Sequence, residues 1–84
     1  MFYVYILQSL KDKNLYIGRT NNLARRIKEH NSGKVASTKS RRPFVMVENI
    51  EVPTEQESVI LEKEYKKRYR REEIRKKYNL GGFA

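Results

Sequence analysis

The 84-residue chain contains no cysteine and a single histidine, His30. The first absence excludes disulfide bonds, a disulfide-linked partner and zinc held by cysteine, and the second excludes a metal cage of histidines. The longest apolar run, Val4 to Leu7, is far shorter than the roughly 18 residues that cross a membrane. No secretory leader opens the sequence. We therefore expect one small domain, residues 1–84, without membrane contact and located in the cytoplasm.

Acidic residues are also scarce, with 10 Asp and Glu against 19 Lys and Arg, and the net charge is +9. The excess is concentrated in residues 19–42, where eight basic side chains stand against Glu29 alone, whereas residues 43–61 carry only acidic charges. This asymmetry predicts a basic surface for a polyanion, most simply nucleic acid, although an ordinary solvated surface is the alternative. The candidate nucleic-acid-binding residues are Arg19, Arg25, Lys34, Lys39, Arg41 and Arg42.

Hydrophobic patterning predicts three strands. Phe2–Leu7 is aromatic and β-branched, and Leu15–Gly18 returns after a polar turn over residues 11–14, so the two segments form a hairpin. Phe44–Val52 predicts the third strand, in which the apolar alternation changes phase after Val47.

Capping signals predict the helices. Asn21 or Asn22 can cap a first helix that ends near Gly33, and residues 34–43 form a polar loop with a short helical turn. Residues 54–57 form a capping box for a second helix. That helix is predicted to turn Leu61, Tyr65 and Tyr69 toward the sheet. A further short helix is predicted over residues 72–78, followed by a frayed end at Gly81 and Gly82. The order β-β-α-β-α predicts an α+β fold, a small three-stranded, mostly antiparallel sheet flanked by helices.

Five side chains stand out as candidates for chemistry. Tyr5 and Tyr16 lie on paired strands, and Arg26 and His30 are four residues apart on one helix face. Glu62 lies beside the apolar stripe of the later helix. Taken singly, each has an ordinary structural explanation, such as packing for the tyrosines and a surface ion pair with the residue four positions on for the glutamate.

The ordered set resembles the GIY-YIG nuclease superfamily over nearly the whole chain. The resemblance is carried by Tyr-Val-Tyr-Ile-Leu, Tyr-Ile-Gly-Arg-Thr, Asn-Leu-Ala-Arg-Arg-Ile-Lys-Glu-His-Asn and Leu-Glu-Lys-Glu. The later His-Asn-Ser-Gly-Lys and Arg-Arg-Pro segments are similar to the small stand-alone YhbQ/YazA-like group. Tyr3 stands where the name-giving pattern has its first glycine, a change that affects packing more than catalysis because Tyr5 is retained.

The resemblance implies that Tyr5, Tyr16, Arg26, His30 and Glu62 are catalytic, with Glu62 as the only carboxylate for a Mg²⁺ ion. In another helix register, Glu64 would take that place. An arginine suits a phosphate because its guanidinium donates two parallel hydrogen bonds.

The proton transfer has two candidate bases. A free tyrosine, with a pKa of about 10, is a weak base at neutral pH, so a tyrosine base needs a nearby cation such as Arg19 or the metal. We expect Tyr16 to be the general base and His30 to assist it. The alternative is that His30 is itself the base.

The function implied by the resemblance is a Mg²⁺-dependent endonuclease that hydrolyses phosphodiester bonds, in DNA rather than RNA. Little sequence specificity is expected because so small a domain leaves little surface for reading bases. Discrimination would then come from the structure of the strand, which points to a role in DNA repair or processing. One rival is a non-catalytic nucleic-acid-binding module on the same fold. Another is a small adaptor whose basic surface binds an acidic protein. Metal-dependent cleavage separates the first function from the second, and a salt titration on bare nucleic acid separates the second from the third.

Overall fold

The sheet has three antiparallel strands in the order β2-β1-β3. They are β1 (Phe2–Ser9), β2 (Leu15–Thr20) and β3 (Phe44–Val52) in the computed structural model, which describes residues 1–80. The central strand β1 is buried on both faces, which explains why its sequence shows no alternation of apolar and polar residues. The predicted three-stranded antiparallel sheet is confirmed, and the frayed end predicted at Gly81 and Gly82 lies outside the described residues.

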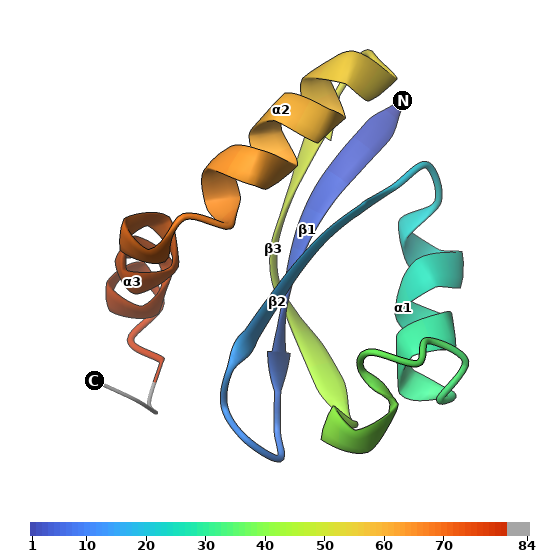
Figure 1. Ribbon diagram of the computed structural model, residues 1–84, viewed down its shortest axis with the longest axis vertical. Helices are drawn as coiled ribbons and strands as arrows, with labels where there is room; N and C mark the ends of the chain where they lie inside the picture. Colours follow the sequence, from blue (N-terminus) through green and yellow to red (C-terminus); the bar gives the residue numbers. More distant parts are fainter. Residues whose placement is uncertain (81–84) are drawn as a thin grey trace.

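Helices cover both faces of this sheet, with α1 (Leu23–Asn31) on one side and α2 (Glu55–Tyr65) and α3 (Arg68–Lys77) on the other (Figure 1). Each side has its own apolar core. On the α1 side the core contains Tyr5, Leu7, Tyr16, Leu23, Ile27, Phe44 and Met46. On the other side it contains Val4, Ile6, Leu15, Ile17, Val47, Ile50, Leu61, Tyr65, Ile74 and Leu80. The predicted α+β fold is confirmed.

The helix starts match their capping signals. The Asn22 side chain accepts a hydrogen bond from the backbone of Arg25, and the Thr54 side chain accepts one from Glu57. Gly33 follows α1 with a φ of +83°, a left-handed conformation that favours glycine. A short 3-10 helix, η1 (Lys39–Arg41), lies in the polar loop before β3. No helix within residues 1–80 is long and apolar enough to span a bilayer.

The predicted stripe of Leu61, Tyr65 and Tyr69 is wrong at its last member. α2 ends at Tyr65, and Lys67 adopts an extended conformation before α3 begins, so the chain changes direction. Tyr69 therefore lies on α3, is 53% exposed, and donates a hydrogen bond to Glu64 instead of entering the core. The break also places the third helix at 68–77 and not at 72–78.

The phase change predicted in the third strand corresponds to a register shift between β1 and β3. Ile6 pairs with Glu48 and Leu7 with Met46, so Val47 is an extra residue on the β3 side. The shift moves the inward-facing residues of β3 from the α1 core, which contains Met46, to the opposite core, which contains Ile50.

Candidate active site

Tyr5 and Tyr16 lie on the α1 face of the sheet. In the register of the hairpin Tyr5 pairs with Gly18 and Leu7 with Tyr16, so the two tyrosines are diagonal neighbours, with ring centroids 6.4 Å apart. The Tyr5 ring crosses Gly18 so closely that a Cβ at that position would lie 2.4 Å from the Tyr5 hydroxyl oxygen. The glycine of the Tyr-Ile-Gly triplet is therefore required by the path of the tyrosine side chain.

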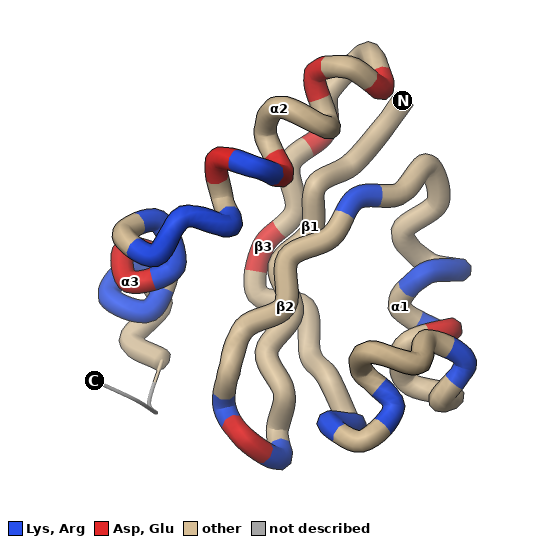
Figure 2. The backbone as a smooth tube through the Cα atoms, in the orientation of Figure 1, with Lys and Arg blue, Asp and Glu red and all other residues tan. Residues whose placement is uncertain are grey.

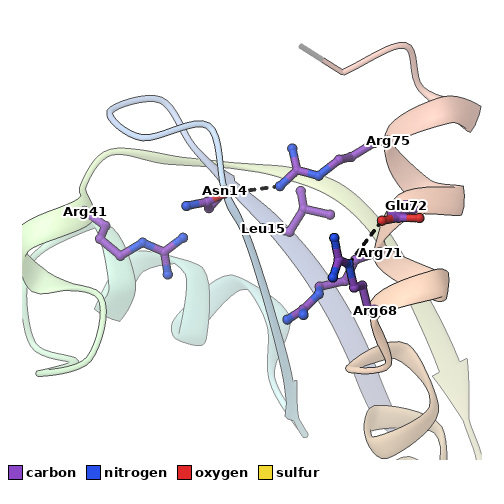
Figure 3. A pocket seen from close by; sticks show the side chains of 7 residues that line it. All are labelled: Asn14, Leu15, Arg41, Arg68, Arg71, Glu72 and Arg75. Atoms are coloured by element: carbon purple, nitrogen blue, oxygen red, sulfur yellow. Dashed lines mark hydrogen bonds and ion pairs between the residues drawn. The ribbon is translucent and has the colours of Figure 1, made fainter. Parts of the chain in front are cut away.

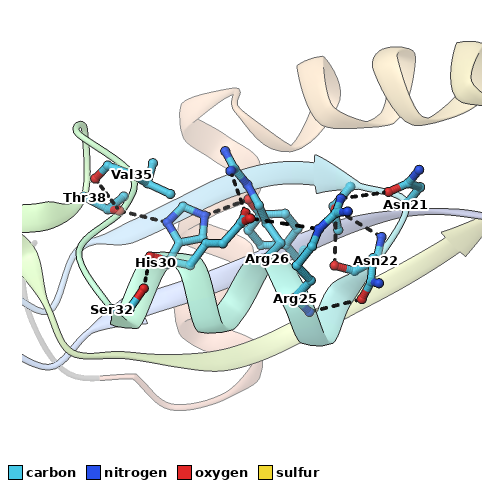
Figure 4. Close-up of polar contacts among 11 residues, drawn as sticks. Asn21, Asn22, Arg25, Arg26, His30, Ser32, Val35 and Thr38 are labelled. Carbon is cyan, nitrogen blue, oxygen red and sulfur yellow. Dashed lines mark hydrogen bonds and ion pairs between the residues drawn. The ribbon is translucent and has the colours of Figure 1, made fainter.

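His30 lies beneath these rings at the end of α1 and is fully buried. Its Nε2 is 2.8 Å from the Tyr5 hydroxyl, and its Nδ1 is 2.8 Å from the Thr38 Oγ1 (Figure 4). Because the Thr38 hydroxyl donates to the Val35 carbonyl, it accepts from His30 Nδ1, which leaves Nε2 to accept from Tyr5. The geometry thus assigns one neutral tautomer to the imidazole.

The electrostatics agree with this assignment. Burial lowers the pKa of His30, and the neighbouring Arg26 guanidinium lowers it further, so the ring is held neutral. Burial also raises the pKa of the Tyr5 hydroxyl, although its hydrogen bond with Arg26 opposes the rise. The same hydrogen bond is the main reason why the pKa of Arg26 is raised. Arg26 also contacts Glu29 at 3.1 Å on α1.

Tyr16 differs from Tyr5 in having a free hydroxyl. Its ring lies 4.9 Å from that of His30, edge to face, but among the described residues its hydroxyl has no hydrogen-bond partner. The ring nitrogens of His30 contact Tyr5 and Thr38 instead. The predicted direct help of His30 to Tyr16 therefore has no hydrogen bond to support it, because Tyr5 occupies the nitrogen that would provide it.

Glu62 lies on α2, on the other side of the sheet from the tyrosine rings. Its carboxylate lies 3.6 Å from Arg19 of β2 and 3.6 Å from Lys66, and the Lys66 contact is the surface ion pair expected one helical turn on. The negative charge of Glu62 also contributes to the raised pKa of Tyr5. Glu64 instead binds Lys67 and Tyr69. Of the two glutamates considered from the sequence, Glu62 is the one that pairs with Arg19 of β2 and whose charge acts on Tyr5.

A single carboxylate fits a Mg²⁺ ion, which commonly takes one or two carboxylates and completes its shell with water and phosphate oxygens. Residues 1–80 contain no group of three or more Asp, Glu, His or Cys that could hold a metal ion by themselves. The donor chemistry around Glu62 therefore suits a metal that is shared with a phosphate, and not one enclosed by protein ligands.

The predicted nucleic-acid-binding residues have different surroundings. Lys34 and Lys39 are exposed, with no acidic partner in the described part of the chain. The others make contacts within the protein: Arg19 with Glu55 and Glu62, Arg25 with Glu29, Arg41 with Asp12, and Arg42 with the Lys39 carbonyl. Lys and Arg also gather on α3, outside the segment singled out from the sequence (Figure 2).

Two site-building residues were missed in the sequence. Thr38 orients His30, and the Asn31 side chain joins α1 to β3 through both backbone groups of Phe44, with distances of 2.7 and 3.1 Å. Asn31 carried a signal because it follows His30 in the His-Asn-Ser-Gly-Lys segment, whereas Thr38 lies in a loop without periodicity.

Comparisons with known proteins identify the family of the chain. The GIY-YIG catalytic domain family matches residues 1–79. The UPF0213 protein BH0048 of Halalkalibacterium halodurans is 44% identical over 70 residues, which cover 82% of this chain and 73% of that protein. The UPF0213 protein of Syntrophus aciditrophicus is 55% identical over 47 residues, which cover 54% of this chain. Those residues span 53% of the Syntrophus protein, about half of its length.

A solved structure extends the agreement to the fold. The solution NMR structure of the UPF0213 protein BH0048 from Bacillus halodurans matches with a TM-score of 0.54 at 40% sequence identity. The match covers 88% of this chain and 82% of that one. The family inferred from the motifs is confirmed, and the chain belongs to the GIY-YIG family, in the small stand-alone group that includes the UPF0213 proteins.

Proposed function

We propose that this domain hydrolyses phosphodiester bonds in nucleic acid, with DNA as the polymer and a divalent metal ion, Mg²⁺, as the cofactor. The observation that carries the proposal is the meeting of three elements at Tyr5: His30 and Arg26 from α1 bind its hydroxyl, and the charge of Glu62 from α2 acts on it. A buried hydroxyl held by an arginine and a neutral imidazole, with a carboxylate whose charge acts on it, suits the positioning of a phosphate and a water molecule.

The proposed roles follow from which groups are free. The Tyr16 side chain, whose oxygen has no partner among the described residues, would act as a phenolate: its oxygen would accept the proton of the attacking water and become the neutral hydroxyl. Tyr5 is held by His30 and orients the water or the phosphate. Arg26 is half-buried and directs its guanidinium toward the site, where it can bind a non-bridging phosphate oxygen through parallel hydrogen bonds.

Glu62 would hold the metal ion, whose chemistry is the neutralisation of charge on the phosphate. Arg19 and Lys66, which pair with Glu62, would supply further positive charge beside the phosphate. Binding would be dominated by contacts with phosphates, to which the exposed Lys34 and Lys39 contribute, so cleavage would depend little on sequence. Discrimination would come from the shape of the strand, which fits a role in DNA repair or processing.

Incubation of the purified protein with labelled single-stranded, duplex and branched DNA tests this proposal, with Mg²⁺ in one arm and a chelator in the other. Glu62→Gln is expected to abolish metal-dependent cleavage without weakening DNA binding, because it removes the ligand and also one negative charge near a polyanion. Glu64→Gln is the matched control on the same helix, and its cleavage rate should equal that of the wild type.

Two outcomes contradict the proposal. Binding without cleavage under every metal condition would identify a non-catalytic binding module. If cleavage survives in Glu62→Gln and is lost in Glu64→Gln, then Glu64 holds the metal ion and our assignment of Glu62 is wrong. Labelled RNA substrates of the same shapes test the choice of polymer, because we expect cleavage of DNA and not of RNA.

A further inference from the structure

A second concentration of positive charge lies on the far side of β2 from Tyr16. A cavity of about 390 Å³ opens between the start of β2, the η1 segment and one face of α3 (Figure 3). Its charged lining is four arginines against one glutamate: Arg41, Arg68, Arg71, Arg75 and Glu72. The α3 arginines recur at intervals of three and four residues, which places them on one face of the helix.

The contacts within the pocket leave guanidinium groups available for a ligand. Arg68 pairs with Glu72 at 3.3 Å, and Arg41 pairs with Asp12 at 2.7 Å. Arg75 donates to the Lys13 carbonyl at 3.2 Å and so joins the helix to the hairpin turn. Arg71 is exposed, and its side chain has no ion pair with an acidic residue in the described part of the chain. The pocket therefore keeps a net positive charge even after its internal ion pairs are counted.

The pocket and the candidate active site share the edge strand of the sheet. Leu15 lines the pocket, and Tyr16, the next residue, faces α1 on the opposite side. Arg19, which contacts Glu62, lies four residues after Leu15 along β2. At ~3.3 Å per residue that separation is about 13 Å, or roughly four nucleotides of a stacked strand. One nucleic-acid strand that follows the β2 edge can contact both places.

We propose that the pocket lined by Arg41, Arg68, Arg71 and Arg75 binds the phosphate backbone of the substrate strand, a few nucleotides from the scissile bond. The inference rests on the proposed function for its geometry, and it adds a binding site on α3 that no catalytic role requires. Guanidinium groups suit this task because their planar donors match the oxygens of a phosphate. Among the described residues, Leu15 is the only apolar one that lines the pocket, and it offers no aromatic ring on which a base could stack, so the lining fits contacts with a backbone.

An oligonucleotide of 12 single-stranded nucleotides, bound in the presence of chelator, provides a test that needs no cleavage. Arg71→Gln should reduce the slope of log affinity against log salt by about 0.7 and weaken binding about fivefold at 0.1 M salt, the effect of one lost phosphate contact. Glu72→Gln should strengthen binding because it removes the only acid in the pocket lining. Lys63→Gln, an exposed charge on α2 between two glutamates, is the matched control and should leave the slope unchanged.

The outcomes separate this inference from the proposed function. If the protein cleaves DNA but Arg71→Gln and Glu72→Gln bind as the wild type does, the pocket is not a phosphate site. If the predicted slopes appear and no substrate is cleaved, the pocket is a phosphate-binding site and the proposed nuclease activity is contradicted. Displacement of the oligonucleotide by polyglutamate at equal charge concentration would assign the pocket to acidic proteins and overturn the inference. Glu72→Gln also keeps the test decisive should Arg71→Gln fold poorly, because the two changes act in opposite directions.

Discussion

Gly18→Ala is a one-carbon change that tests how tightly the tyrosine cluster is built. The added Cβ would lie 2.4 Å from the hydroxyl oxygen of Tyr5, 2.6 Å from its Cζ and 3.1 Å from its Cε1. The Tyr5 ring cannot move away freely, because it is 1% exposed and its hydroxyl is fixed by His30. The added methyl group must therefore displace the tyrosine or the strand that carries it.

The sign of the stability change separates this clash from backbone effects. Gly18 is not in the left-handed region, so alanine fits its backbone and would by itself stabilise the protein by about 0.4–1 kcal/mol. Overpacking of a close-packed site instead costs about 1–3 kcal/mol. We expect the clash to dominate, with a net loss of about 1–2 kcal/mol in the free energy of unfolding and a fall in Tm of roughly 4–16 °C.

Urea unfolding of four proteins measures this effect: wild type, Gly18→Ala, Tyr5→Leu and the double variant. Leucine lacks the ring atoms that the new Cβ would strike, so the double variant should be more stable than the sum of the two single changes predicts, by about 1 kcal/mol or more. A Gly18→Ala protein as stable as the wild type, or strictly additive effects, would refute the reasoning about this contact.

Three further outcomes follow from the same contacts. Burial lowers the pKa of His30, so below pH ~6.5 the folded state binds fewer protons than the unfolded chain. The free energy of unfolding should therefore fall as the pH decreases from there, by at most about 1.4 kcal/mol per pH unit. In urea titrations, His30→Gln should lose this contribution to the pH dependence. Arg41 lowers the pKa of Asp12 to about 2, so Asp12→Asn should lower Tm above pH ~4, and its difference from the wild type should vanish as the pH falls through about 2. In cleavage assays Tyr16→Phe should lower the rate by about 10²–10⁴-fold with little change in Tm, and Tyr5→Phe should lower it less; a histidine base is indicated instead if Tyr16→Phe cleaves normally.

Much of the fold could be predicted because its signals are local. The hairpin, the capping residues Asn22 and Thr54 and the phase change in β3 all depend on neighbours within a few positions, and each has its expected counterpart in the structure. The break between α2 and α3 was misplaced, since residues 66 and 67 are both lysine and neither glycine nor proline marks the turn. Helix propensity alone cannot locate such a break, because packing of the two helices against the sheet decides it.

The candidate site was predictable to the extent that secondary structure fixes it. Strand pairing brings Tyr5 to Tyr16, and helix periodicity brings Arg26 to His30, so four members could be grouped from the sequence. The partner of His30 could not, because Thr38 reaches it from an irregular loop. The arginine pocket was missed for a similar reason: its walls come from α3 and from the start of β2, which only tertiary packing brings together.

The Asn31 side chain affects whether another polypeptide can add as a strand to the edge of the sheet. β3 is an edge strand, and an edge strand presents free N–H and C=O groups to which another polypeptide can add. At Phe44 both groups are already satisfied by the side-chain amide of Asn31, which donates and accepts as a neighbouring strand would. The amide therefore blocks strand addition at this end of β3, so the contact that docks α1 on the sheet also opposes edge-to-edge pairing there.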